Sequence, residues 1–245
     1  MTPRNALILG ASGTLGGAIA RELIARGCAA GLHYHAHKEP CEALAREAQA
    51  KGVKACCYAA DFADPAAPGA LATAFLKDFP TVDALVWAAG MVRDAPLLTL
   101  TEEDLRAVLD VDLKAFFLTL KALARQFIKQ RTGAIVALSS HAALAGRAGG
   151  TAYAMAHSGL LALVKSAARE LGPVGVRVNA VIPPFVPESG MGRTASPEFA
   201  AAARQKRVLK PDADGATALA MFVCDVLGNP AISGQVLSAD SRIAV

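Results

Sequence analysis

Hydrophobic and polar positions along this chain of 245 residues follow two alternating patterns. Short runs of apolar residues recur, and between them apolar residues return at helical spacing among polar ones. The short runs predict about seven strands, which lie at 6–9, 29–34, 53–58, 84–87, 135–138, 176–181 and 235–238. Apolar strands that alternate with helices are typical of a parallel sheet covered by helices on both faces. We therefore expect an α/β protein.

The helical patterns predict helices at 14–26, 42–51, 102–130 and 153–171. Thr99 or Thr101 is placed to cap the third of these, ahead of acidic residues. Residues 183–210 contain several prolines and little periodicity, so we predict a loop that covers the site. No linker divides the chain, and residues 1–245 are expected to form a single domain.

Composition narrows the class of protein. Hydrophobic residues make up 53% of the chain and charged residues 19%, which is enough for a buried core. The net charge of +4 comes from scattered Lys and Arg, so we expect no nucleic-acid partner. The five cysteines form no CxxC pair, as is typical of reduced thiols. A strand begins within a few residues of the start and no apolar run is long enough for a membrane span, so we expect a cytoplasmic protein.

A glycine-rich turn follows the first predicted strand and opens the first helix. Glycine lets the backbone turn tightly and lets a pyrophosphate approach, and the helix N-terminus offers N–H groups to the phosphates. The glycines stand at 10, 13 and 16, with Thr14 between them. The turn predicts a dinucleotide site formed by Gly10, Ser12, Gly13, Thr14, Leu15 and Gly16.

The end of the second predicted strand indicates which dinucleotide binds. NAD-binding folds place a carboxylate there to hold the ribose 2′-hydroxyl, but this chain has Tyr34. His35 and Lys38 follow and are suited to a 2′-phosphate, so NADPH is the expected cofactor. A metal site formed by His33, His35 and His37 is the weaker alternative, because such a site needs a further ligand. We expect no metal.

Ser140 and Tyr153 carry the chemical signature of the chain, and His157 stands where a lysine would complete it. At this spacing, serine, tyrosine and lysine mark the short-chain dehydrogenase/reductase family. The chain resembles that family from end to end, most of all its 3-oxoacyl-carrier-protein reductases. The resemblance implies a Rossmann-type, doubly wound parallel sheet. It also implies a carbonyl substrate, either a small molecule or one bound to an acyl carrier.

The resemblance assigns a role to each catalytic position. Ser140 corresponds to the serine that hydrogen-bonds the substrate oxygen, and Tyr153 to the tyrosine that exchanges a proton with it. His157 replaces the lysine that activates the tyrosine, and Asp112 replaces an asparagine that orders a water near that lysine. A neutral imidazole activates the tyrosine less than an ammonium group does. Two explanations stay open: Asp112 and His157 form a charge-assisted pair that restores part of the charge, or the site has decayed.

The resemblance also implies further contacts with the cofactor. Asp61 and Phe62 match a pair that contacts adenine, although Asp61 is also a candidate helix N-cap. An Asn-Asn-Ala-Gly stretch of the family is reduced here to its last two residues, and Trp87 in its first position is expected to fill core space. Pro184 and Glu188 depart from the family pattern near the carboxamide. The matched residues after the fourth strand are Ala88, Ala89 and Gly90.

Two functions follow from these departures. The first is an NADPH-dependent carbonyl reductase with an altered set of catalytic residues, which acts on a substrate like a 3-oxoacyl thioester. The second is a catalytically silent member that serves as a structural or regulatory subunit beside an active paralogue. In both cases we expect a dimer or tetramer, alone or with that paralogue, packed through 102–130 and 153–171. Leu160, Leu161, Leu163 and Val164 supply the apolar surface for that contact, unless they belong to the intramolecular core.

Overall fold

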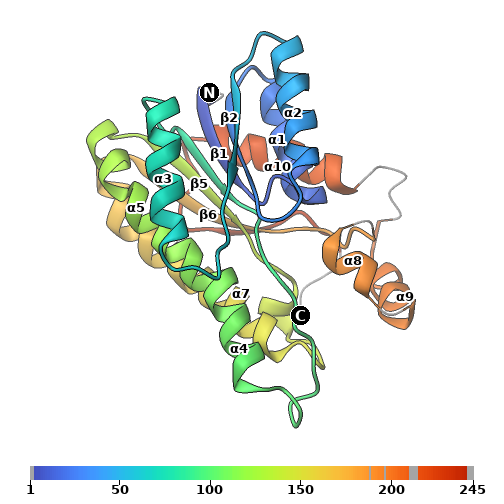
Figure 1. Ribbon diagram of the computed structural model, residues 1–245. Helices are drawn as coiled ribbons and strands as arrows, with labels where there is room; N and C mark the ends of the chain where they lie inside the picture. The colour runs from blue at the N-terminus through green and yellow to red at the C-terminus, as the bar shows by residue number, and fades with distance from the viewer. Residues whose placement is uncertain (1–2, 188, 196, 210–214, 242–245) are drawn as a thin grey trace.

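The computed structural model describes residues 3–187, 189–195, 197–209 and 215–241. Within them, parallel strands form a 7-stranded sheet in the order β3-β2-β1-β4-β5-β6-β7, which confirms the predicted doubly wound architecture (Figure 1). The strands are β1 (Asn5–Leu9), β2 (Ala29–Tyr34), β3 (Ala55–Ala59), β4 (Ala84–Trp87), β5 (Gly133–Leu138), β6 (Val176–Ile182) and β7 (Val236–Ser238).

Helices cover both faces of the sheet (Figure 1). One face carries α1 (Thr14–Ala25), α2 (Glu39–Ala50) and α10 (Gly215–Gly228). The other carries α3 (Ala67–Asp78), α4 (Glu102–Leu109), α5 (Ala115–Gln130) and α7 (Thr151–Leu171). The short α6 (Ala142–Ala145) precedes α7. No helix in the described ranges is long and apolar enough to cross a membrane.

Alternate residues of each strand supply the two cores. Leu7 and Leu9 of β1 pack into the core under α3, α5 and α7, whereas Ala6 and Ile8 pack into the core under α1 and α10. Successive side chains of a strand point to opposite faces, so a strand covered on both sides is apolar at every position. The uninterrupted apolar runs of the sequence have this physical cause.

The strand order reverses between β1 and β4. β1 pairs with β2 on one side and with β4 on the other. The chain therefore leaves β1 toward β2 and β3, but leaves β4 in the opposite direction, toward β5 and β6. In open parallel sheets, ligands bind at such a switch point, beyond the carboxyl ends of the strands. The glycine turn after β1 and residues 88–90 after β4 meet there.

The helix predicted at 102–130 is present over that whole range, but its hydrogen bonding is not uniform. A π-helical turn, Asp110–Lys114, lies between α4 and α5, and neither glycine nor proline marks it. A single π turn takes an extra residue into the helix and is frequent at functional sites. The turn contains Asp112, which is fully buried.

The loop predicted at 183–210 contains two short helices, so that prediction is partly wrong. These are α8 (Gly190–Thr194) and α9 (Pro197–Gln205), which lie together beside the sheet (Figure 1). The Ser189 side chain caps α8 by accepting the N–H of Gly192, and Pro197 occupies the first position of α9, where a missing N–H costs nothing. The alanines of Ala200–Ala203 have high helix propensity. The loop prediction gave too much weight to the prolines and too little to this run.

Candidate active site

The turn between β1 and α1 needs glycine at two of its three positions. Gly10 has φ +84°, and a Cβ there would lie 2.6 Å from the Ala88 carbonyl oxygen. A Cβ on Gly16 would lie 2.2 Å from the Gly10 carbonyl oxygen, whereas one on Gly13 would meet only ordinary contact. Gly13 caps α1 without a side-chain hydrogen bond, and no acidic residue stands in the first turn. This helix N-terminus can therefore receive an anion.

His33 supports the glycine turn from inside the protein. Its Nδ1 accepts the N–H of Gly10 at 3.0 Å and its Nε2 lies 3.0 Å from the Ala60 carbonyl oxygen, so the neutral ring with its proton on Nε2 satisfies both contacts. Burial lowers the pKa of His33 to about 4. Both ring nitrogens of His33 are thus engaged within the protein, which leaves neither to hold the metal of the His33, His35 and His37 alternative.

Aromatic rings continue inward from His33. The ring of Phe62 stacks on His33 at 4.3 Å and on Trp87 at 5.0 Å, and Trp87 is followed by Phe116 at 5.3 Å. Trp87 is completely buried, so it fills core space as expected. Because the Phe62 ring is stacked on His33 and Trp87 and is buried, its side chain has little free surface for the adenine contact expected of it.

The expected adenosine end is exposed and rich in charged groups. His35 Nε2 lies 3.7 Å from an Asp61 carboxylate oxygen, and Lys38 forms an ion pair with Glu42 at 2.7 Å. Asp61 also accepts the N–H of Ala63 and does not cap α3, because that helix begins at Ala67 after Ala66. The N-cap alternative for Asp61 is therefore wrong. Tyr34, at the end of β2, is half-buried.

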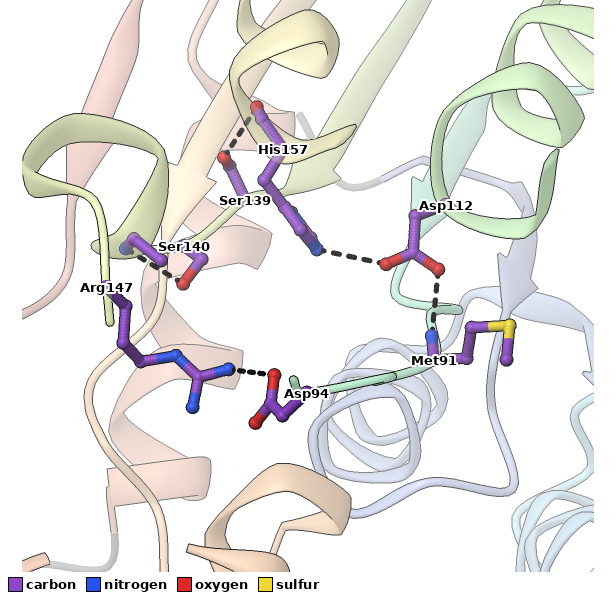
Figure 2. Close-up of polar contacts among 8 residues, drawn as sticks. Met91, Asp94, Asp112, Ser139, Ser140, Arg147 and His157 are labelled. Carbon is purple, nitrogen blue, oxygen red and sulfur yellow. Dashed lines mark hydrogen bonds and ion pairs between the residues drawn. The ribbon is translucent and has the colours of Figure 1, made fainter. Parts of the chain in front are cut away.

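Asp112 and His157 face each other at the chemical end. The Asp112 Oδ2 lies 3.4 Å from His157 Nε2, and its Oδ1 accepts the N–H of Met91 at 2.8 Å (Figure 2). The 3.4 Å contact is an ion-pair distance whose angles fall short of a hydrogen bond. Burial raises the pKa of Asp112, and His157 opposes that rise. The two changed positions are therefore in direct contact.

Tyr153 packs on the other side of the imidazole. The ring centroids of Tyr153 and His157 are 4.1 Å apart, and Tyr153 is 8% exposed. Burial raises the pKa of Tyr153 above its usual range, the Asp112 charge raises it further, and a hydrogen bond with Ser140 lowers it. Ser140 also accepts the N–H of Ala142, while Ser139 donates to the His157 carbonyl oxygen. Tyr153 is thus held as a neutral phenol beside Ser140.

One cavity of about 550 Å³ joins the glycine turn to these groups. Its lining includes residues 13–16, residues 88–92, Ser140, Tyr153 and His157. Pro184 also lines it, whereas Glu188 lies outside the described residues. Of the expected site residues, Gly10, Ser12, Tyr34, His35, Lys38, Asp61, Phe62 and Asp112 do not line this cavity.

Known proteins share this architecture. The family model described as short chain dehydrogenase matches residues 4–199. The chain belongs to the short-chain dehydrogenase family. The 3-oxoacyl-[acyl-carrier-protein] reductase FabG of Staphylococcus aureus (strain N315), a relative of this chain, is 37% identical over 183 residues, which cover 75% of this chain and 74% of that protein.

Solved structures agree with this membership. A dehydrogenase/reductase from Sinorhizobium meliloti 1021 matches with a TM-score of 0.89 and 27% identity, over 99% of this chain and 95% of that one. A short chain dehydrogenase from Burkholderia cenocepacia J2315, solved in complex with NADP, matches with a TM-score of 0.88 and 30% identity, over 98% and 97% of the two chains. The resemblance that the sequence motifs indicated is confirmed.

Within this short-chain dehydrogenase, sequence reasoning missed two residues that line the cavity. Arg147 and Lys206 belong to segments with no recognised motif, the loop before α7 and the end of α9. Arg147 stands between Gly146 and Ala148, and Lys206 between Gln205 and Arg207, so only the tertiary structure draws attention to these two cations.

Proposed function

We propose that this protein is an NADPH-dependent reductase of carbonyl compounds of the 3-oxoacyl type. The observation that carries the proposal is the single cavity that joins the glycine turn and the α1 N-terminus to Ser140 and Tyr153. A phosphate-binding end and a proton-donating end within one cavity are what carbonyl reduction requires. The FabG relative, a 3-oxoacyl-[acyl-carrier-protein] reductase, supports the same substrate class.

The residues present fit the cofactor. The close approach of Gly10 and Gly16 to neighbouring backbone leaves no room for side chains at the turn, and the α1 N-terminus, whose N-cap Gly13 has no side chain, suits a pyrophosphate. No described carboxylate follows Tyr34 directly, and His35 and Lys38 are placed to favour a 2′-phosphate. The Burkholderia relative was solved with NADP. When bound, NADPH supplies the hydride that reduces the carbonyl carbon.

The protein's own residues supply the proton and hold the substrate oxygen. Ser140 donates a hydrogen bond to that oxygen, and Tyr153 transfers its phenolic proton to it as the C–H bond forms, leaving a hydroxyl group. Since burial raises the pKa of Tyr153, the phenol is in the protonated form that reduction needs. An imidazolium at His157, balanced by Asp112, would stabilise the tyrosinate that results.

A catalytically silent subunit beside an active paralogue is the second candidate. One observation favours it: the His157 Nε2 is directed at Asp112, where the family's lysine would reach the cofactor ribose (Figure 2). In that case the site would bind NADPH weakly or not at all. The function of the protein would then be to assemble with the active paralogue.

Cofactor titration followed by turnover tests the proposal. We expect NADPH to quench or shift the fluorescence of the protein at lower concentration than NADH does, and this gap to shrink in Lys38→Ala. Lys51→Ala, at the far end of α2, is the matched control and should keep it. A 3-oxoacyl thioester should be reduced by the natural sequence and not by Tyr153→Phe. NADH binding as tightly as NADPH, or turnover that survives Tyr153→Phe, would contradict the proposal.

A further inference from the structure

A cation lies in the wall of the cavity beside the proposed proton donor. Arg147 belongs to the loop between α6 and α7, and its side chain is 19% exposed. It lines the same cavity as Ser140 and Tyr153, and its positive charge opposes part of the rise that burial causes in the pKa of Tyr153. Figure 2 shows its guanidinium extending below Ser140 to Asp94. None of the proposed steps uses this side chain.

A glycine makes room for the guanidinium. A Cβ on Gly150 would lie 2.7 Å from Arg147 Nε and 2.9 Å from Nη2. Gly150 has φ −110°, a conformation that any residue adopts, so the backbone itself does not require glycine here. A larger residue at position 150 would therefore displace the Arg147 guanidinium from its present place.

The fold gives no reason for a cation at this place. Gly150 caps α7, and the positive end of a helix dipole disfavours a nearby cation. Partial burial adds a desolvation cost. Asp94 offsets part of both costs, and the N–H of Ala95 donates to the Gly149 carbonyl oxygen, which holds the two segments together. Asp94 is 40% exposed, so solvent screens its charge more than that of Arg147.

The charged side chains that line the described part of the cavity are all basic. The lining contains Arg147 and, from the end of α9, Lys206, and none of its described residues is Asp or Glu. The remaining walls at this end are mostly apolar, as in Val92, Phe185 and Val186. An anionic group that enters between such walls meets Lys206 and the guanidinium of Arg147, which Asp94 holds from outside the described lining. The planar guanidinium matches a carboxylate group well.

We infer that the preferred substrate is a 3-oxo acid in its free, anionic form, and that Arg147 binds its carboxylate while Ser140 and Tyr153 contact the reacting carbonyl. This inference rests on the proposed function and deepens it: the thioester is still reduced, but the free acid is the better substrate. Asp94 acts as a positioning residue that holds the guanidinium toward the cavity. Gly150 keeps that position open.

Turnover of a charged and a neutral substrate tests the inference. We would measure kcat/KM with NADPH for 3-oxobutanoate and for its methyl ester, in the natural sequence, Arg147→Met and Arg147→Lys. Loss of a charge-assisted hydrogen bond should lower kcat/KM for the anion by roughly tenfold or more in Arg147→Met, and for the ester by less than about twofold. Arg147→Lys should recover part of the loss. Arg93→Met is the control, because Arg93 pairs with Asp104 and does not line the cavity.

Equilibrium binding of 3-oxobutanoate by calorimetry separates this inference from the proposed function. Binding of 3-oxobutanoate that depends on Arg147, with no turnover of either substrate, would contradict the proposed reductase activity and support the anion site. Equal losses for anion and ester in Arg147→Met would overturn the inference while the reductase survives. Binding that ignores the Arg147 substitution, or no binding at all, would also overturn it.

Discussion

His33 ties the cofactor turn to the core through one uncharged ring. The ring accepts from Gly10 at Nδ1 and contacts the Ala60 carbonyl oxygen at Nε2, so a second proton would break the first contact. Phe62 covers one face of the ring. The position of the glycine turn thus depends on the neutral state of a single side chain.

Acid should therefore cost this protein stability through His33. Burial lowers the pKa of His33 to about 4. The unfolded chain takes up this proton near pH 6.5, so the contribution is complete above that pH and is lost as pH falls toward 4. Between pH 7.5 and 4.5 we expect the free energy of unfolding to fall by about 2 to 3 kcal/mol more than in His33→Asn. The free energy of unfolding would be measured by urea denaturation at each pH. An equal change with pH in the natural protein and in His33→Asn would contradict this prediction.

The pairing of Asp112 with His157 also belongs to the residue scale. If the pair supplies charge to Tyr153, Asp112→Asn should lower kcat/KM for the carbonyl substrate by roughly tenfold, because the imidazolium loses its counterion. Asp110→Asn is the control, since Asp110 lies in the same helical turn and pairs with Lys114 at the surface. A double variant, Asp112→Asn with His157→Lys, that exceeds the natural activity would instead show a decayed site.

At the scale of elements, the passage from α4 to α5 determines where Asp112 points. The π-helical turn Asp110–Lys114 lies within the helix that the sequence pattern predicts over 102–130. The start of α4 is simpler, because Thr101 occupies the N-cap with β-region dihedral angles and accepts the N–H of Asp104 at 3.1 Å. Acidic residues in the first turn add favourable interactions with the helix dipole.

Removal of this cap should be measurable. Thr101→Ala should lower the free energy of unfolding by about 1 kcal/mol, because one backbone N–H loses its partner. Thr99→Ala is the matched control: the Thr99 hydroxyl donates only to the exposed Pro96 carbonyl oxygen, and its loss should change stability by less than about 0.5 kcal/mol. Equal effects in thermal or urea denaturation would show that Thr101 does not act as a cap.

At the scale of the whole molecule, three of the four apolar residues that suggested assembly belong to the core of a single chain, and the fourth, Leu163, is partly buried against that core. Leu160 and Val164 are completely buried and Leu161 is 8% exposed, so the intramolecular alternative holds for them. Other apolar side chains remain on the same two helices: Phe117 and Ile128 on α5 and Met155 on α7 are 46%, 47% and 48% exposed. The assembly prediction now depends on these.

We expect a dimer or tetramer packed through α5 and α7. Phe117→Glu with Met155→Glu should lower the mass found by light scattering at micromolar concentration, because charges would be buried at the contact. Leu98→Glu is the control, since Leu98 is 99% exposed on the loop before α4 and lies outside both helices. A monomeric natural protein would contradict the prediction.

The sequence by itself determined the layers of the fold and the family. Strands buried on both faces must be apolar throughout, and a phosphate-binding turn must contain glycine, so both leave a local pattern. Ser140 and Tyr153 were recognisable because they lie close together in the sequence, so that their spacing forms a local motif. Only the tertiary structure decided the rest. It decided the π turn at Asp112, the uncharged state of the His33 ring and the place of the Arg147 guanidinium beside Gly150. These features depend on tertiary contacts, and such contacts leave no periodic pattern in a single sequence.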